Sequence, residues 1–341
     1  MKRTSSSSDL ATEMIGRHHD VAHIMACVAE ADCCSVVGVS NIGKSTLLRS
    51  VALPGVHQEH LGPSADDGVF VYVDFNLMLQ MTEQGFYEVI LRRIRDMLET
   101  AHPDDELVTI TVRNYQTVIS ADSQFTGPLA FEQSLETVCR KVAMLVLLFD
   151  EFDEVFGEIE PRVFVRLRAL KDKHWPRLCY VTATGHPLSE IRRGRQVGEF
   201  CELFAAHTHH LTPLSEASAR ELVQDWAAQS RARFTSQDID FVLGCAGGHP
   251  VLLQITWRLL ARAKEETFKS AVVDYGRIRE RLDSDANVRI ECAKLWNDLS
   301  LREQETLTAP LGGKDVPETL DSLREKGIVL VSAEGARVFA S

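Results

Sequence analysis

Residues 36–48 constrain the fold of this chain more than any other stretch. They read Val-Val-Gly-Val-Ser-Asn-Ile-Gly-Lys-Ser-Thr-Leu-Leu and contain the complete pattern G-x-x-x-x-G-K-[ST]. The apolar residues before it predict a short buried strand at 33–37, and residues 46–52 are predicted to form a helix that ends before Pro54. A strand, a glycine-rich turn and a helix in this order form the context that a phosphate-binding loop requires.

Each residue type in this loop has a physical reason. Gly38 and Gly43 permit backbone angles at which successive N–H groups turn toward one anion. Lys44 brings a positive charge to the β- and γ-phosphates, and Ser45 offers a hydroxyl to Mg²⁺. The N-terminal end of the following helix favours the same anion. We therefore predict that the chain binds a nucleoside triphosphate together with Mg²⁺.

Residues 142–151 are the second informative stretch, because an apolar run ends there in two adjacent carboxylates. Ligands of doubly wound sheets bind at the carboxyl ends of such strands. Asp150 is expected to hold the Mg²⁺ hydration shell and Glu151 to polarise the water that attacks the γ-phosphate. The alternative, a core strand followed by a solvated acidic turn, is disfavoured by the glycine-rich loop upstream. Asp153 and Glu154 are expected to face solvent.

Further strands and helices complete a predicted α/β core. Strands are predicted at 69–75, 178–183 and 209–214, and helices at 9–31, 83–101, about 129–141 and 158–173. Residues 54–68 are predicted to be a polar linker, and residues 102–128 to be either strand or loops. Thr184, at a strand end, is expected to reach the γ-phosphate or the attacking water. A threonine that merely ends the strand is an equally good interpretation.

Two clusters of polar side chains have competing interpretations. The first contains Arg192, Arg193 and Arg195. A solvated basic segment is favoured there over an arginine finger that acts on a neighbouring subunit's nucleotide. The second contains His207, His209 and His210. No acidic or cysteine partner stands at ligand spacing nearby in the sequence, and alternate residues of a strand point to opposite faces, so we do not predict a metal site there.

Composition restricts the class of protein. A chain of 341 residues allows two or three domains, and 45% hydrophobic with 25% charged residues is typical of a soluble globular protein. The net charge of −12 argues against a general nucleic-acid coat. Apolar runs are too short to span a bilayer, and we expect the first residues to be a mobile tail rather than a signal peptide. The eight cysteines include no C-x-x-C pair, which indicates reduced thiols, so we expect a cytoplasmic protein without membrane association.

From Ser215 onward the pattern becomes helical. Ser215 is a predicted N-cap, a second helix begins near Thr235, and Pro250 begins a long helix that extends to about residue 269. Residues 286–341 contain three predicted helices, one of which starts with a capping box at Ser300, and a hairpin. These are the elements of a winged helix.

Taken together, the motifs resemble those of AAA+ P-loop ATPases, close to the signal-transduction ATPases called STAND and to origin-recognition-like archaeal ATPases. The resemblance rests on Gly16-Arg17, residues 38–46, residues 147–153, Leu211-Thr-Pro-Leu-Ser and Gly247-Gly248-His249-Pro250. It implies an α/β core with a parallel sheet covered by helices on both faces, a helical lid and a C-terminal winged helix. The implied domains are a disordered tail (1–12), the ATPase core (13–213), the lid (214–285) and the winged helix (286–341).

The resemblance also extends the expected site. In that family the turn equivalent to Gly248-His249-Pro250 contacts nucleotide, and the Gly16-Arg17 element lies near the base; a plain helix-start turn is the alternative for the former. The expected nucleotide-binding residues are Arg17, Gly38, Asn41, Ile42, Gly43, Lys44, Ser45, Thr46, Gly248, His249 and Pro250. The expected catalytic residues are Lys44, Glu151 and Thr184, and the expected Mg²⁺ residues are Ser45 and Asp150.

The leading hypothesis is an ATP-binding, slowly hydrolysing switch. The nucleotide is expected between the core and the lid, so that its γ-phosphate sets their relative angle. STAND proteins usually carry a sensor array and an effector domain, and we do not expect residues 1–341 to contain either one. Separate polypeptides are therefore the expected partners, and nucleotide-dependent homo-oligomers are a further expectation.

The alternative is a DNA-binding AAA+ ATPase, similar to replication or transposition regulators. Residues 286–341 carry seven Lys and Arg against nine Asp and Glu, a net charge of −2. Phosphate contacts dominate DNA affinity, so this composition disfavours DNA as a partner. A kinase would need a phosphoacceptor pocket, of which the sequence gives no sign.

Overall fold

The computed structural model describes residues 16–62, 67–101, 106–266, 273–308, 317–331 and 337–339. The predicted N-terminal tail at 1–12 and the hairpin turn at 333–335 lie outside these residues. The contacts divide the chain into two compact units. We call the part comprising His19–Val37 and Lys44–His209 the sheet unit. We call the part comprising residues 16–18, Gly38–Gly43 and the described residues from His210 onward the helical unit.

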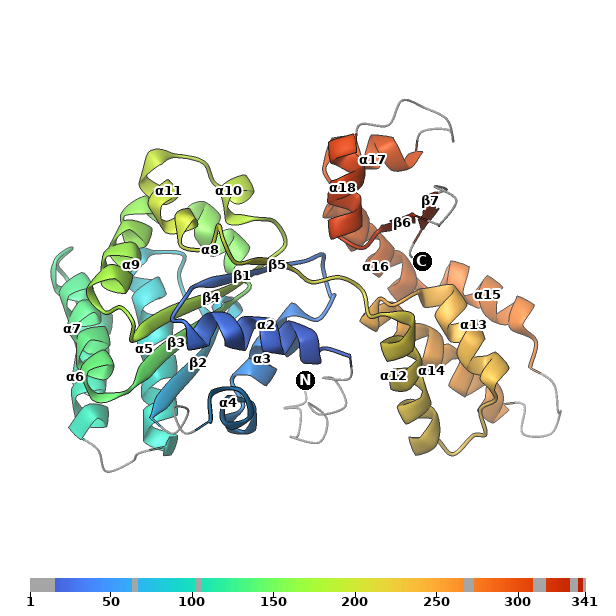
Figure 1. Ribbon diagram of the computed structural model, residues 1–341, viewed down its shortest axis with the longest axis horizontal. Helices are drawn as coiled ribbons and strands as arrows, with labels where there is room; N and C mark the ends of the chain where they lie inside the picture. The colour runs from blue at the N-terminus through green and yellow to red at the C-terminus, as the bar shows by residue number, and fades with distance from the viewer. Residues whose placement is uncertain are drawn as a thin grey trace. The chain divides into compact units, whose positions relative to one another are not determined.

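The sheet unit is built on a five-stranded sheet (Figure 1). Its strand order is β2-β3-β4-β1-β5. The strands are β1 (Cys34–Val37), β2 (Gly68–Asp74), β3 (Met144–Asp150), β4 (Leu178–Thr184) and β5 (Thr208–His210). β2 pairs with β3, β3 with β4 and β4 with β1, each in parallel. Their near-continuous apolar sequences are those of strands buried on both faces.

Helices follow the strands as a doubly wound sheet requires. They are α2 (His18–Ala29), α3 (Lys44–Val51), α4 (Pro54–Leu61), α5 (Glu83–Ala101), α6 (Glu106–Ile119), α7 (Thr126–Lys141), α8 (Phe152–Glu158), α9 (Pro161–Lys173), α10 (Leu188–Ile191) and α11 (Arg195–Glu202), with a 3-10 turn η2 (Phe75–Leu77). Alternate residues of the strands point to opposite faces of the sheet. Val71 and Phe149 lie on one face and pack in the core with residues of α5, α7, α8 and α9. Phe70, one position away, instead stacks on His57 of α4. The sheet is therefore covered on both faces, as expected.

The helical unit contains most of the remaining elements. They are α12 (Glu216–Gln229), α13 (Ser236–Ala246), α14 (Pro250–Glu266), α15 (Tyr275–Ser284), α16 (Ala286–Asn297), α17 (Leu301–Thr308) and α18 (Pro317–Glu325), with the antiparallel hairpin β6 (Val329–Val331) and β7 (Arg337–Phe339). Helices α12, α13, α14 and α15 share one hydrophobic core, which includes the fully buried Val223, Val242 and Leu253. A smaller one contains Leu299, Leu323 and Val329.

The predicted helix starts in this unit are confirmed. The Ser215 hydroxyl accepts from the backbone N–H of Ser218, and Thr235 begins α13 with a capping box. The backbone N–H of Ser300 donates to the Glu303 carboxylate at 2.7 Å, which is the predicted capping box of α17. Pro250 begins α14 at the position where a missing N–H costs least.

Four sequence expectations are wrong. Residues 54–68 are not a linker throughout, because Pro54 begins α4 rather than a loop. The β-branched residues within 102–128 favour strand or loop, yet the described part contains α6 and the start of α7, whose apolar sides pack into the core. The helix predicted at 158–173 begins only at Pro161, because Glu158 ends α8, and β5 ends at His210 instead of continuing to residue 214. Among the described helices, none is long and apolar enough to cross a membrane.

Candidate nucleotide site

The carboxyl edge of the sheet gathers the residues expected to bind Mg²⁺ and carry out hydrolysis. β3 ends at Asp150 and β4 ends at Thr184. In the register of the sheet Val37 pairs with Thr184, and Asp74 pairs with Asp150. Because β1 ends at Val37, the glycine-rich loop leaves the sheet at the same edge. The ends of β3 and β4 thus lie at the carboxyl edge of the sheet, as the sequence predicted.

Asp150 is buried, with 2% of its surface exposed, and only one of its two carboxylate oxygens has a partner in the protein. Its Oδ2 accepts a hydrogen bond of 2.5 Å from the Tyr72 hydroxyl, and its Oδ1 is buried without a partner. A buried carboxylate oxygen left in this state is costly unless a cation or a water bound to one completes it. The residue therefore fits the expected magnesium role. Tyr72, which orients the carboxylate, was not predicted from the sequence.

Glu151 follows Asp150 in a strained backbone conformation. Its φ is +55° in the left-handed region, at the N-cap of α8, and its side chain is exposed. Such angles are rare for a residue with a long side chain and cluster at functional sites. Although the residue is exposed, protein atoms partly surround its carboxyl group; this partial desolvation and the neighbouring Asp150 raise the pKa of Glu151, and the charge of Lys44 opposes them. A raised pKa brings a carboxylate closer to the range of a general base.

Asp153 was predicted to face solvent, and this prediction is wrong. It accepts a hydrogen bond of 2.8 Å from the backbone N–H of Gly185, just beyond the end of β4. Burial raises the pKa of Asp153, which this hydrogen bond and the charge of Lys44 partly offset. Asp153 therefore connects the segment after β3 to the segment after β4. Glu154 is exposed, as expected.

Thr184 lies where the sequence placed it, at the end of β4. Its side chain is fully buried and its hydroxyl has no hydrogen-bond partner. A buried hydroxyl without a partner is unusual and favours a role toward a ligand over the simple strand-ending role. Ser45 and Thr46 lie in the first turn of α3, where both are half-buried.

The phosphate-binding loop itself, Gly38–Gly43, belongs to the helical unit by its contacts. Gly43 has a φ of +111°, which a residue with a side chain rarely adopts. A Cβ at Gly38 would come within 2.9 Å of the Leu211 carbonyl oxygen. Asn41 also has a positive φ, at +59°, and is exposed. Both glycines of the motif are therefore required by the shape of the loop.

Two acidic residues bind this loop: Glu291 lies in α16, and Asp298 caps its C-terminal end. The backbone N–H of Ser40 donates to Asp298 Oδ2 at 2.5 Å, and the Ser40 hydroxyl donates to Asp298 Oδ1 at 3.1 Å. The Asn41 amide donates to Glu291 Oε2 at 2.5 Å. Neither acid was predicted. In the loop of this motif, backbone N–H groups are the donors that bind phosphate. The Asp298 carboxylate is thus bound by loop donors of the kind that bind phosphate.

Arg17 also contacts the loop. It is 7% exposed, and its guanidinium donates to the Ile42 carbonyl and the Thr212 carbonyl, each at 2.8 Å. This side chain holds the backbone of the loop against the segment that follows β5. The resemblance implied a place near the base, and the observed contacts add a role in positioning the loop.

The turn at Gly248 and His249 reaches the same loop. His249 is buried, and its Nε2–H donates to the Ser40 carbonyl at 3.2 Å while its Nδ1 accepts from the Leu252 N–H at 3.5 Å. Burial lowers the pKa of His249, which favours this neutral form. A Cβ on Gly248 would come within 2.0 Å of the Leu214 carbonyl oxygen. This turn is therefore more than a plain helix start. Pro250 follows as the first residue of α14.

The arginine segment is partly used within the sheet unit. Arg192 donates to the carbonyl of Ile159 at 2.5 Å and to that of Phe156 at 3.4 Å. Arg193 and Arg195 are exposed. The two contacts of Arg192 are made within one chain and do not test an arginine finger acting on another subunit.

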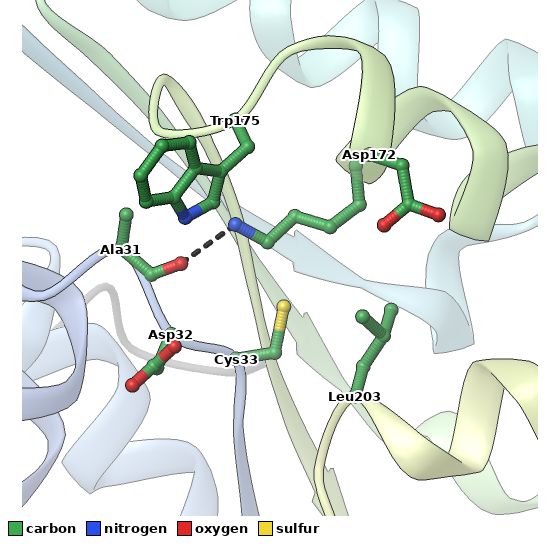
Figure 2. Close-up of a pocket in the computed structure, with 7 residues that line it drawn as sticks. Ala31, Asp32, Cys33, Asp172, Trp175 and Leu203 are labelled. Carbon is green, nitrogen blue, oxygen red and sulfur yellow. Dashed lines mark hydrogen bonds between the residues drawn. The ribbon is translucent and has the colours of Figure 1, made fainter.

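Two hollows lie in the sheet unit. One, of about 300 Å³, is lined by the segment after β2 and by Glu151, Glu154 and Val155. The other, of about 400 Å³, lies near the start of β1, at the edge opposite the loop. Figure 2 shows Ala31, Cys33 and Trp175 around it, and Lys171 donates to the Ala31 carbonyl at 2.6 Å. That donor is satisfied by the backbone, so this hollow adds nothing to the candidate site.

Comparison with known proteins identifies the family. The family model described as Novel STAND NTPase 1 matches residues 7–309. The chain belongs to this family. A search of curated proteins gives no match in sequence. The resemblance drawn from the motifs is therefore confirmed at the level of the family.

Solved structures confirm the fold. The chain is similar to the Walker-type ATPase of Pyrococcus abyssi, with a TM-score of 0.60 and 13% identity over 100% of this chain and 96% of that one. It is also similar to the Aeropyrum pernix ORC2 protein in ADPNP–ADP complexes (TM-score 0.52, 13% identity, 98% and 88% covered). A third match is the Aeropyrum pernix ORC1 protein in complex with DNA (0.53, 11%, 97% and 90%). This member of the Novel STAND NTPase 1 family thus has the expected AAA+ P-loop fold.

Proposed function

We propose that this protein is a molecular switch that binds ATP, hydrolyses it slowly and changes its conformation, assembly or partner with the state of the nucleotide. The observation that carries this proposal is the pair of hydrogen bonds from Ser40 to Asp298. It connects the phosphate-binding loop directly to the C-terminal elements that we propose to form a winged helix.

Two anions would compete for the donors of this loop. A phosphate group and a carboxylate both need those donors, and two negative charges at this distance repel each other. Phosphate binding at Ser40 would therefore require Asp298 to leave. Release of Asp298, with Glu291, would free α16 and the elements after it from the loop. Nucleotide binding would thereby change the C-terminal elements, and Asp298 would return after hydrolysis and phosphate release.

The residues of the sheet edge are assigned the hydrolytic roles. Lys44 and Ser45 would bind the phosphates and the metal ion, and Asp150 would hold the metal through the oxygen that has no protein partner. When bound, Mg²⁺ neutralises charge on the phosphates. Glu151 would accept a proton from the attacking water, and the Thr184 hydroxyl would orient the γ-phosphate or that water. Turnover is proposed to be slow because each cycle must break and remake the Asp298 contacts.

Two variants test the enzymatic part. Lys44→Ala should abolish ATP binding, and Glu151→Gln should keep binding but stop phosphate release. Glu154→Gln, an exposed neighbour on the same helix, is the matched control and should hydrolyse ATP at the wild-type rate. Undiminished phosphate release by both Lys44→Ala and Glu151→Gln would refute the assignment.

The proposed assembly is tested by measuring molecular size. The protein is compared with ADP, with ATP, and as Glu151→Gln with ATP. Assembly specific to the ATP states supports a nucleotide-dependent homo-oligomer, and an unchanged monomer in all three refutes it. Separately encoded protein partners and a cytoplasmic location complete the proposal.

A DNA-binding ATPase remains the second candidate, because the similar ORC1 structure is a complex with DNA. Against it stands the acidic balance of residues 286–341. A mobility-shift assay with duplex DNA decides between the two. Binding that weakens steeply with salt would favour DNA as the partner, and an unshifted duplex favours a protein.

A further inference from the structure

A second group of chemically active side chains lies in the sheet unit, away from the carboxyl edge. His23 and Cys27 belong to α2, and Cys34 is the first residue of β1. One ligand-type atom from each of the three lies within 4.8 Å of the other two. His23 and Cys27 are four residues apart on a helix, which places them on the same face.

The distance between His23 and Cys27 suits a tetrahedral metal ion. With Zn–S bonds of about 2.3 Å and Zn–N bonds of about 2.0–2.1 Å, ligand atoms around zinc are separated by about 3.5–3.8 Å. His23 Nε2 lies 3.9 Å from Cys27 Sγ, so little adjustment would be needed for this pair. Cys34 is held by the parallel pairing of β1 with β4, opposite Val181. Two of the three ligands thus sit on one helix face and the third on a fixed strand.

Burial and charge also favour a metal. Cys27 is 5% exposed and Cys34 is fully buried, while His23 is partly exposed and offers a route from solvent. Two thiolates and a neutral imidazole would cancel the double charge of Zn²⁺, so that the buried site carries no net charge. Sulfur and imidazole ligands select a soft or borderline ion and disfavour Mg²⁺.

The histidines near β5 support this group. His209 stacks on His23 with ring centroids 4.6 Å apart, and its Nε2 bonds Asp20 at 2.7 Å. His207 bonds Asp32 at 3.2 Å. His207 and His209 therefore do have acidic partners, which come from α2 and the turn after it and could not be found by local spacing. Asp20 holds the His209 ring, and stacking on that ring restricts the plane of His23.

We propose that His23, Cys27 and Cys34 bind one zinc ion, with water in the fourth position. The ion would join α2 to β1, the strand that runs directly into the phosphate-binding loop. Nothing in the switch proposal depends on this site, and the site does not depend on the switch.

The first test uses the unmodified full-length protein. After treatment with a chelator, it is titrated with Co²⁺ in buffer that contains excess Mg²⁺ to occupy oxygen-rich sites. One equivalent should produce thiolate-to-cobalt charge transfer and the intense visible bands of tetrahedral Co²⁺, and one equivalent of Zn²⁺ should remove them. X-ray absorption of the zinc-loaded protein should then show two sulfur ligands at about 2.3 Å. Absence of the thiolate band, or a shell of oxygen and nitrogen alone, would refute the site.

The second test uses variants. Cys27→Ser, Cys34→Ser and His23→Ala should each lower zinc affinity at least tenfold and reduce the cobalt bands. Cys179→Ser, a buried thiol on the neighbouring strand, and Cys292→Ser, an exposed thiol, are the controls and should bind as the wild type does. Wild-type zinc affinity in the three ligand variants would contradict the proposal. If a variant does not fold, the absorption measurement on the unmodified protein decides alone.

Discussion

The Asp298 carboxylate accepts hydrogen bonds from both the backbone N–H and the hydroxyl of Ser40, 258 residues earlier in the chain. Ser40 lies in the middle of the phosphate-binding loop. Hydrogen bonds to a charged group contribute about 1.5–3 kcal/mol each, so the two bonds from Ser40 to Asp298 are strong enough to compete with the binding of a phosphate group. The relation between these two residues underlies the proposed switch.

The strained backbone of Glu151 gives the first prediction. Glu151→Gly should raise the free energy of unfolding by about 0.5–1 kcal/mol, because relief of a left-handed φ outweighs the entropic cost of glycine. Glu151→Gln keeps the side-chain size and the strain but removes a charge that burial and Asp150 disfavour, so it should be at least as stable as the wild type and less stable than Glu151→Gly. Urea unfolding monitored by circular dichroism measures both. A Glu151→Gly variant less stable than Glu151→Gln would show that the strain is absent.

The pH dependence of hydrolysis gives the second prediction. A general base must be ionised, and the pKa of Glu151 is raised above its ordinary value of 4.5 by burial and by Asp150. The rate should therefore fall on the acid side with a midpoint above pH 4.5, as measured from kcat/KM for phosphate release. Glu154→Gln should leave that midpoint unchanged. A midpoint at or below 4.5 would argue against Glu151 as the base.

The ion pair between Lys326 and Glu303 gives the third prediction. Glu303 is 2% exposed, and Lys326 Nζ lies 2.8 Å from its Oε2. Lys326→Met should destabilise the C-terminal elements by about 3 kcal/mol, because a buried carboxylate loses its counter-charge. Thermal or urea unfolding measures the effect.

A neighbouring exposed pair provides the control for this prediction. Arg324 and Asp321 bond at 2.7 Å on the surface of α18, with side chains 47% and 63% exposed. Arg324→Met should cost less than about 1 kcal/mol. Equal losses in the two variants would contradict the assigned burial of Glu303.

Two glycines of the helical unit give the fourth prediction. Gly248→Ala should destabilise the protein by about 1–3 kcal/mol, because the new methyl group would meet the backbone of Leu214. Gly244→Ala, in α13 with open space around it, should instead stabilise by about 1 kcal/mol. Melting temperatures of the two variants should therefore shift in opposite directions, and shifts of the same sign would contradict the close approach of Gly248 to Leu214.

Local sequence signals predicted the parts of the site that lie close together in the chain. The glycine loop between β1 and α3 and the carboxylates at the end of β3 were found because strand, turn and helix patterns are local. Thr184 was found because parallel strands end at a common edge. The family followed from combining these motifs.

Partners that come from distant elements were missed. Asp298 and Glu291 follow Ser40 and Asn41 by 258 and 250 residues, and their own sequence indicates only an ordinary helix. Tyr72 resembles any residue of a buried strand. α6 was missed because Val, Thr and Ile in its sequence favour strands locally, whereas packing against α5 and α7 decides its conformation.

The ATP affinity of Asp298→Ala tests the central claim most directly. Loss of the competing carboxylate should tighten ATP binding at least tenfold, equivalent to about 1.4 kcal/mol, as measured by calorimetry with Glu151→Gln as the background to prevent turnover. Asp321→Ala, which removes an exposed acid of α18, should bind ATP as the background does. Unchanged or weaker ATP binding by a folded Asp298→Ala variant would contradict the proposed competition at Ser40.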